Sequence, residues 1–125
     1  MRIFKSKWFD RYARKEGISD DLLLDAVARA ERGQIDADLG GEVIKQRIAR
    51  PGEGRSKGYR TILLLRRGAK AYFVYGFSKS ERVNISVGEQ RDFKDSAKVV
   101  LSMTDATIKV RLQRGDFVEV NNANE

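Results

Sequence analysis

The sequence predicts an α+β protein built on a mainly antiparallel sheet. Two stretches with helical apolar spacing precede Gly33, the apolar period then falls to two between Ile35 and Phe77, and helical spacing returns after Lys79. Helices and strands that occur in separate runs are typical of α+β folds. We expect one domain spanning residues 1–125.

The N-terminal part predicts a short strand followed by two helices. Met1–Lys5 fits an edge strand, and Ser6 fits the cap of a helix that ends at Glu16, before Gly17. Its aromatic residues Trp8, Phe9 and Tyr12 share one side, so we expect them in the core rather than on a base-stacking surface.

Ser19 is a suitable cap for a second helix, which ends at Gly33. The link between the two helices is short, so we expect them to pack antiparallel.

The central part predicts four strands. Gly40-Gly41 reads as a hairpin turn, and residues 49–58 read as a loop. The apolar run Ile62–Leu65 indicates a strand that is buried on both faces. The expected strands are Ile35–Leu39, Val43–Ile48, Tyr59–Arg66 and Ala71–Phe77, the last two forming an antiparallel hairpin.

The C-terminal part begins with a helix and ends ambiguously. Ser86 and Glu89 have capping-box spacing, and the helix that follows is expected to end near Met103. The alternation in residues 108–120 favours a β-hairpin, whereas Thr104-Asp105 is a plausible helix cap.

Composition restricts the chemistry that is open to the chain. There is no cysteine and no histidine, which removes thiolate chemistry, disulfides and the usual general base. No apolar run approaches the roughly 18 residues of a membrane span, and the N-terminus lacks a signal-peptide core. We therefore expect a cytoplasmic protein with no membrane association.

Positive charge is concentrated in the middle of the chain. Eight cations and two acids lie between Glu42 and Arg67, so this stretch holds six of the seven net positive charges. Such a focus attracts a polyanion, with nucleic acid as the first candidate. A solvated basic surface is the alternative.

Strand alternation divides these cations into two sets. Lys45 and Arg47 lie on one face of their strand, and Arg60 begins the next strand. If the two strands are neighbours, these three cations meet on one sheet face, where a phosphate is the natural partner. Arg50, Arg55 and Lys57 form a separate set in the loop.

Other candidate sites have competing explanations. Asp36 and Asp38 could hold Mg²⁺, but such a pair is more often the solvated face of a hairpin, and we predict no metal site and no cofactor. Tyr59 could stack on an RNA base or anchor its strand in the core. RNA supplies its own nucleophile, the 2′-hydroxyl, so fixed cations can promote cleavage without histidine.

The sequence DADLGGEVIKQRIARPGEGRSKGYRTIL, which starts at Asp36, resembles the RelE-like and HigB-like toxins of type II toxin–antitoxin systems. Within that family it is most similar to a branch with the pattern D-A-D-L-G-G…K-x-R-x-A-R-x-G-x-G-R-S-x-G-Y-R. The flanking stretches KWFDRYARKEGISDDLLLDAVARAERG and AYFVYGFSKSERVNI look like that branch's helical hairpin and last central strand. The resemblance extends over nearly the whole chain.

The resemblance implies a RelE/ParE-like fold, a twisted, mainly antiparallel sheet with an N-terminal helical hairpin and a C-terminal helix. It favours a helix over about residues 105–114, followed by a short strand. It also implies a ribosome-dependent mRNA endonuclease (an mRNA interferase) that uses basic residues and 2′-hydroxyl attack to inhibit translation. The implied partners are mRNA, the ribosome and a cognate antitoxin, often a helix-turn-helix protein.

The resemblance also implies roles for individual residues. Arg60 is the transition-state cation, Lys45 and Arg47 bind phosphate and assist proton transfer, and Lys79 is an auxiliary catalytic cation. Arg82 is the alternative to Lys79, and we include it with the RNA-binding residues Arg50, Arg55, Lys57 and Tyr59.

The sequence lacks a tyrosine after the last central strand that could act as a catalytic stacking residue. This difference leaves open a ParE-like gyrase inhibitor, or a non-enzymatic basic module that binds nucleic acid or protein.

Overall fold

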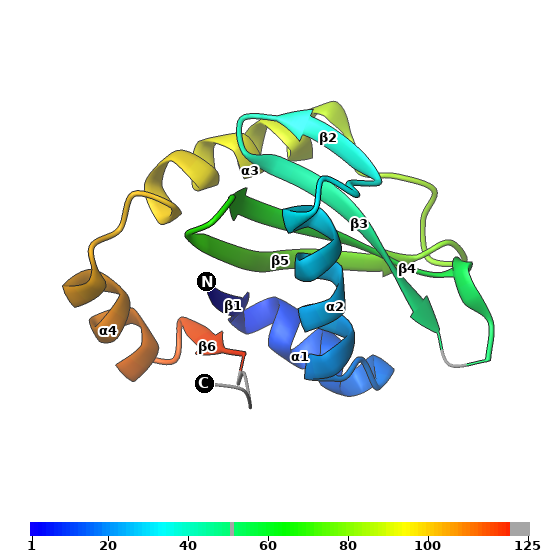
Figure 1. The fold of residues 1–125 in the computed structure, drawn as a ribbon, viewed down its shortest axis with the longest axis horizontal. Helices are drawn as coiled ribbons and strands as arrows, with labels where there is room; N and C mark the ends of the chain where they lie inside the picture. Colours follow the sequence, from blue (N-terminus) through cyan, green and yellow to red (C-terminus); the bar gives the residue numbers. More distant parts are fainter. Residues whose placement is uncertain (51, 121–125) are drawn as a thin grey trace.

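A computed structural model describes residues 1–50 and 52–120, with only the backbone described for residues 55 and 56. It confirms the α+β class (Figure 1). In chain order, the elements are β1 (Arg2–Ser6), α1 (Lys7–Glu16), α2 (Asp20–Glu31), β2 (Ala37–Gly40), β3 (Val43–Arg50), β4 (Gly54–Arg66), β5 (Lys70–Ser78), α3 (Val87–Val100), α4 (Asp105–Gln113) and β6 (Phe117–Glu119).

The strands form one mostly antiparallel sheet in the order β2-β3-β4-β5-β1-β6. β1 runs parallel to β5 on one side and antiparallel to β6 on the other. The expectation that the first strand lies at a sheet edge is therefore wrong. Pairing with β6 joins the two ends of the described chain, and local sequence carries no signal for a contact of that range.

The sheet separates two apolar cores. Side chains of α1 and α2, such as Phe9 and Leu23, pack on one face with Ile48 and Leu63 of the sheet. Side chains of α3 and α4, such as Ala97 and Ile108, pack on the other face. The strand segment Ile62–Leu65 is buried throughout, as the sequence predicts, because helices cover both faces there.

Short polar side chains begin three of the helices at the predicted positions. The hydroxyl oxygens of Ser6 and Ser19 accept hydrogen bonds from the backbone N–H groups of Phe9 and Leu22. Ser86 and Glu89 form the reciprocal capping box at the start of α3.

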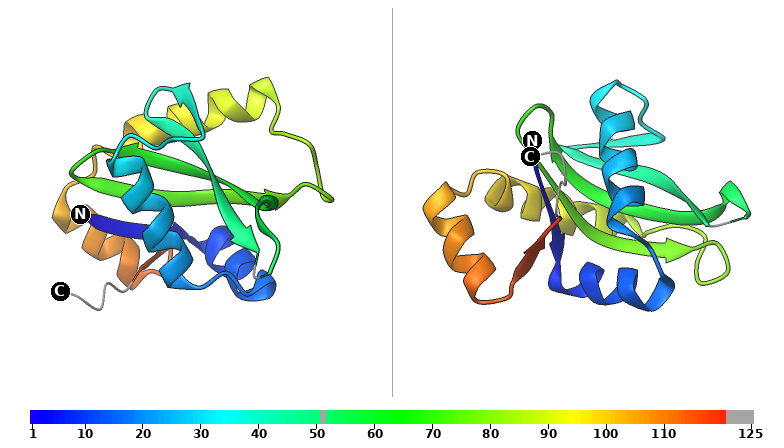
Figure 2. Two further views of the ribbon diagram at one scale, coloured as in Figure 1. Left: turned by 45° about the vertical axis from the view of Figure 1, so that its right-hand side comes forward. Right: turned by 60° about the horizontal axis from the view of Figure 1, so that its bottom comes forward.

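The expectation that the first two helices pack antiparallel is wrong. α1 lies against β5 and β1, whereas α2 lies against β3. α2 rises steeply from the end of α1 in every view (Figure 2). Each helix buries its apolar side against the sheet, and this outweighs packing between the two helices.

The two hairpins that border β3 differ in detail from the prediction. The β2–β3 turn is Gly41-Glu42, one residue later than expected, and Glu42 itself adopts a positive φ of 64°. β4 begins at Gly54, within the stretch expected to be a loop. At Gly58, a Cβ atom would lie 1.9 Å from the carbonyl oxygen of Ile48, so only glycine permits this close approach of β4 to β3.

The tail forms a helix and a short strand rather than a β-hairpin. α4 buries Ile108 against the sheet while Val110 stays 50% exposed, so the alternation of apolar residues does not mark a strand. β6 then pairs with β1 and buries Phe117. Among the described residues, no helix has the length and apolar character needed to span a membrane.

Candidate functional site: an uncovered basic face of the sheet

Arg47 and Arg60 lie directly opposite each other on β3 and β4, and Lys45 lies opposite Ile62. Ile44 and Ile48 of β3 point into the core beneath α1 and α2. Strand alternation therefore directs Lys45 and Arg47 to the other face. The two strands are neighbours, and the predicted set of three cations shares one face.

Helix α3 covers only part of this face. It packs over β3 and β4 in a core that includes Val43, Ile62 and Leu64. Arg47 and Arg60 lie nearer the opposite end of the two strands, where Arg47 is exposed and Arg60 half-buried. The basic residues thus occupy the part of the face that the helix leaves uncovered.

The side chains of these three cations form no ion pairs within the described part of the chain. Lys45 donates a hydrogen bond of 3.2 Å from Nζ to Oδ1 of Asn84, a neutral partner. Within residues 1–50 and 52–120, no carboxylate forms an ion pair with Lys45, Arg47 or Arg60. The Nη1 atom of Arg60 is also buried without a hydrogen-bond acceptor. A buried guanidinium nitrogen without an acceptor lowers the stability of the folded state.

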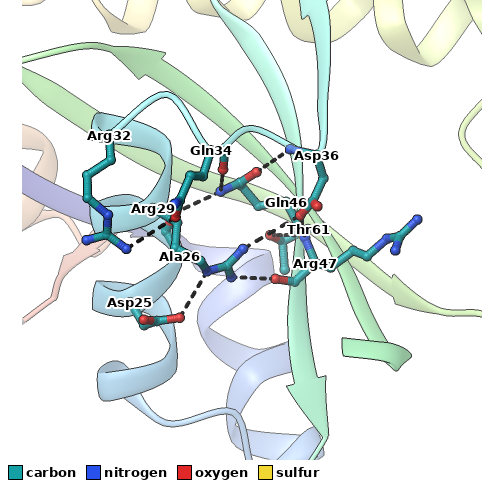
Figure 3. Close-up of polar contacts among 9 residues, drawn as sticks. All are labelled: Asp25, Ala26, Arg29, Arg32, Gln34, Asp36, Gln46, Arg47 and Thr61. Atoms are coloured by element: carbon teal, nitrogen blue, oxygen red, sulfur yellow. Dashed lines mark hydrogen bonds and ion pairs between the residues drawn. The ribbon is translucent and has the colours of Figure 1, made fainter. Parts of the chain in front are cut away.

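The backbone of Arg47 is fixed from α2 and from the segment before β2 (Figure 3). Its N–H donates to Oδ2 of Asp36 at 2.7 Å, and its carbonyl accepts from Nη2 of Arg29 at 2.7 Å. Arg29 is itself held by Asp25 at 3.0 Å. In Figure 3 the Arg47 side chain points away from this network. The network therefore positions the residue while leaving its guanidinium group available.

Gln46 and Asp36 help to connect β3 with α2 and with the segment before β2. Buried Gln46 donates from Nε2 to the carbonyls of Ala26 and Gln34, and its Oε1 accepts from the N–H of Asp36. Asp38 accepts a hydrogen bond from the N–H of Gly40. Both acids weighed above as Mg²⁺ ligands thus have structural partners, and the described part of the chain has no group of three or more acidic side chains arranged to hold a metal ion.

Arg82 lies beside the basic face and is held there by Glu89 and Tyr75. Its guanidinium group makes two hydrogen bonds to Glu89, at 2.9 and 2.6 Å, and one to the Tyr75 hydroxyl. The hydrogen bonds to Glu89 and then to Tyr75 raise the pKa of Arg82, and the bond from Arg82 lowers the pKa of Glu89 to about 2. Arg82 also lies over the ring of Phe77, next to Arg60 in the sheet. Its charge is already balanced by Glu89.

Lys79 lies in the turn after β5 and is exposed. It borders an open hollow of about 390 Å³ at the end of the sheet. The residues that line the hollow are Arg50, Glu53, Lys57, Ser78, Lys79 and Ser80. Lys57 and Lys79 thus line the same hollow, three residues before Arg60 on β4 and two residues after Phe77, the residue of β5 that pairs with Arg60.

Two of the predicted RNA-binding residues belong to the opposite face. Tyr59 is only 3% exposed, and its hydroxyl donates to the carbonyl of Glu16. Arg50 donates to the Tyr59 hydroxyl and lies near Glu16 and Glu53. The geometry thus agrees with the core-anchor alternative for Tyr59. The side chain of Arg55 is outside the described residues.

Arg66 and Arg67, the remaining cations of the basic stretch, lie away from the pair of Arg47 and Arg60. Arg66 binds Glu42 through two hydrogen bonds of 3.0 and 2.9 Å, and Arg67 donates to the carbonyl of Glu31. Both residues lie at the other end of β4. Sequence alone pointed to the whole stretch, but it did not identify Arg29 or Asn84, because neither residue is marked by its local pattern.

Comparison with known proteins gives one match. A family described as "RelE toxin of RelE / RelB toxin-antitoxin system" matches residues 1–120. No curated protein and no solved structure matches the chain.

Proposed function

Since the chain belongs to the RelE toxin family, and is thus a toxin of a toxin–antitoxin system, we propose that it cleaves mRNA on the ribosome. The observation that carries this proposal is the facing pair Arg47 and Arg60 on the uncovered sheet face. Arg47 is exposed and Arg60 half-buried, so both side chains can pair with a phosphodiester group.

The chemistry uses the RNA's own nucleophile. The 2′-hydroxyl oxygen attacks the adjacent phosphorus, the bond from phosphorus to the 5′-oxygen breaks, and the products carry a 2′,3′-cyclic phosphate and a 5′-hydroxyl. Negative charge builds up on the phosphorane oxygens in the transition state, where Arg60 stabilises it. Arg47 holds the phosphate in line, and Lys45 assists transfer of the proton from the 2′-hydroxyl to the leaving 5′-oxygen.

The cations outside this face have a binding role in the proposal. Lys57 and Lys79 line the hollow at the end of the sheet, where they suit the backbone of ribosomal RNA or mRNA. We retain Lys79 as an auxiliary cation, because it follows Phe77, the partner of Arg60 in the sheet, by two residues. Arg82 contributes to the shape of the site by packing over the ring of Phe77.

The test compares two arginines of the same strand. Arg60→Ala removes the proposed transition-state cation, whereas Arg66→Ala removes an arginine bound to Glu42 at the other end of β4. After induction, growth and the 5′ ends of cellular mRNA are measured. We expect Arg60→Ala to restore growth and to reduce cleavage at least 100-fold, an effect typical of a lost transition-state contact. Arg66→Ala is expected to stay toxic.

Two results would contradict the proposal. Full toxicity of a folded Arg60→Ala variant would remove the assigned site. Toxicity of the wild type with DNA damage, and without new 5′ ends inside codons, would identify a gyrase inhibitor instead.

The family also implies an antitoxin partner. We propose that this partner is a helix-turn-helix protein that neutralises the toxin in the cytoplasm and represses their common operon. Co-expression of the neighbouring gene tests this, because an antitoxin would restore growth, co-purify with the toxin and bind the operon's promoter. A neighbouring protein that binds the toxin without binding DNA would argue against the helix-turn-helix class.

A further inference from the structure

Trp8 is the only tryptophan of the chain, and 45% of its surface is exposed. Helical spacing predicts it in the core together with Phe9 and Tyr12, and the structure buries only those two. The mechanism described above does not use this exposed indole.

Trp8 lies at the margin of the basic face. β1 pairs with β5 only as far as Lys5 and Phe73, so the rest of the β5 edge has no strand beside it. There the indole contacts Tyr75, with ring centroids 4.7 Å apart. Tyr75 lies opposite Ile62 of β4, two residues from Phe77, which pairs with Arg60. With neighbouring strands about 4.8 Å apart, β3 and β5 are separated by about 10 Å.

The indole is held in place by its neighbours. Tyr12 stacks on it at 5.1 Å with an interplanar angle of 12°, and Tyr12 is fixed by its hydrogen bond to Glu81. Tyr75 is fixed by the hydrogen bond that it accepts from Arg82. A rigid aromatic surface loses little conformational entropy when a ligand stacks on it.

Cations flank this surface. Trp8, Arg11, Tyr12 and Lys15 line an open hollow of about 250 Å³ on α1. Arg11 has no ion pair or side-chain hydrogen bond with any other described residue, and the nearest acid to Lys15 is Glu16, at 4.0 Å. An aromatic ring beside available cations is the arrangement that binds single-stranded nucleic acid, since bases stack and phosphates pair with the cations.

We propose that Trp8 stacks on a nucleobase of the mRNA strand whose scissile phosphate lies at Arg47 and Arg60, with Arg11 and Lys15 contacting the neighbouring phosphates. The proposal rests on the proposed function, because it names a further contact of the same substrate. It gives the chain an aromatic base contact on α1, on the opposite side of the site from β3.

Because Trp8 is the only tryptophan, its fluorescence reports the contact directly. The wild-type protein is titrated at low ionic strength with a single-stranded oligonucleotide whose 2′-hydroxyls are methylated to prevent cleavage. An abasic strand of the same length is the control. We expect the first strand to quench Trp8 and the abasic strand to bind without quenching. Equal signals from both strands would overturn the proposal.

Two variants connect the contact to cleavage of ribosome-bound mRNA. Trp8→Phe retains a stacking ring, whereas Trp8→Ala does not. We expect Trp8→Ala to raise KM about 5-fold to 100-fold, the range for losing one stacked base, and Trp8→Phe to remain within a few-fold of the wild type. Thermal unfolding of both variants checks that they fold. Wild-type cleavage by a folded Trp8→Ala variant would overturn the proposal.

The outcomes separate this inference from the proposed function. Base-dependent quenching in a wild-type protein that produces no new mRNA 5′ ends would support the Trp8 contact and reject the endonuclease. Normal cleavage by Trp8→Ala, combined with loss of antitoxin binding, would reject the RNA contact and assign Trp8 to the protein partner.

Discussion

The Tyr12 hydroxyl donates a hydrogen bond of 2.7 Å to Oε1 of Glu81, which joins helix α1 to the turn after β5. The same carboxylate oxygen accepts from the N–H of Ser78 at 2.8 Å. Burial, and then the bond to Glu81, raise the pKa of Tyr12, so the hydroxyl keeps its proton and remains a donor. One carboxylate thus holds the turn that carries Lys79 against the helix that carries Trp8.

Tyr12→Phe is expected to lower the free energy of unfolding by about 1 kcal/mol, the usual net contribution of one hydrogen bond. The aromatic ring remains, so stacking with Trp8 is retained. Urea unfolding measures the change. An unchanged midpoint would show that Glu81 finds another donor when the hydroxyl is absent.

Tyr72→Phe is expected to raise the free energy of unfolding rather than lower it. The Tyr72 hydroxyl is buried without a hydrogen-bond partner, and burial raises its pKa to about 12. Removing this group relieves an unsatisfied polar atom, so we expect a gain of about 1 kcal/mol in the free energy of unfolding. The same urea experiment applies, and a loss of stability would mean that the hydroxyl has a partner in solution.

Arg60→Met is expected to abolish toxicity and raise stability together. Methionine retains the apolar stem and removes the buried nitrogen that lacks an acceptor, so we expect a gain of about 1 kcal/mol. Inorganic phosphate is expected to raise the thermal midpoint of the wild type by binding this face. The variant would show a smaller increase, and an equal increase in both proteins would place the anion elsewhere.

Gly58→Ala is expected to destabilise the protein by more than 2 kcal/mol, because the new Cβ would lie 1.9 Å from a carbonyl oxygen of β3 and force the two strands apart. Gly88→Ala is the matched control, since its Cβ would meet only the Ser86 hydroxyl at 3.9 Å. The control is expected to be neutral or slightly stabilising. Thermal unfolding compares the two, and similar midpoints would contradict the close strand contact.

The Glu89 carboxyl is expected to contribute to acid unfolding. Its pKa falls from 4.5 to about 2 in the folded protein, chiefly because Arg82 donates hydrogen bonds to it. The folded state therefore binds this proton less readily than the unfolded state. The resulting stability is fully present above pH 4.5 and is lost as the pH falls toward 2.

Glu89→Gln is expected to flatten the dependence of unfolding free energy on pH in that interval. Glu42 also has a lowered pKa, through its hydrogen bond from Arg66, so part of the slope is expected to remain. Urea unfolding at several pH values measures both slopes, and identical slopes would show that the Arg82 pair forms only weakly in solution.

Local chemistry predicted much of the fold. The caps at Ser6, Ser19 and Ser86 act within four residues of sequence, and strand alternation placed Lys45 and Arg47 on the correct face. Periodicity was wrong in the tail, because Ile108 and Leu112 lie four residues apart and fit a helix as well as they fit a strand.

The site depended more on tertiary contacts. Sequence grouped the basic residues, but only the structure shows that Glu42 binds Arg66 and that Glu89 binds Arg82. Arg47 and Arg60 are left as facing cations whose side chains form no ion pair among the described residues. The exposure of Trp8 could not be predicted from the sequence either, because it depends on the end of the β1–β5 pairing at Lys5.

The position of β1 has a consequence for how the chain folds during synthesis. Strand β1 pairs on one side with β5 and on the other with β6, and the N–H of Val120 donates to the carbonyl of Ile3. Both neighbours of β1 are translated much later, so β1 waits with two unpaired edges, and pairing over such sequence separations is slow. A nascent chain that stops before Phe117 lacks the strand that completes this side of the sheet. The complete sheet, with the α1 surface attached to it, therefore forms only after β6 has been synthesised.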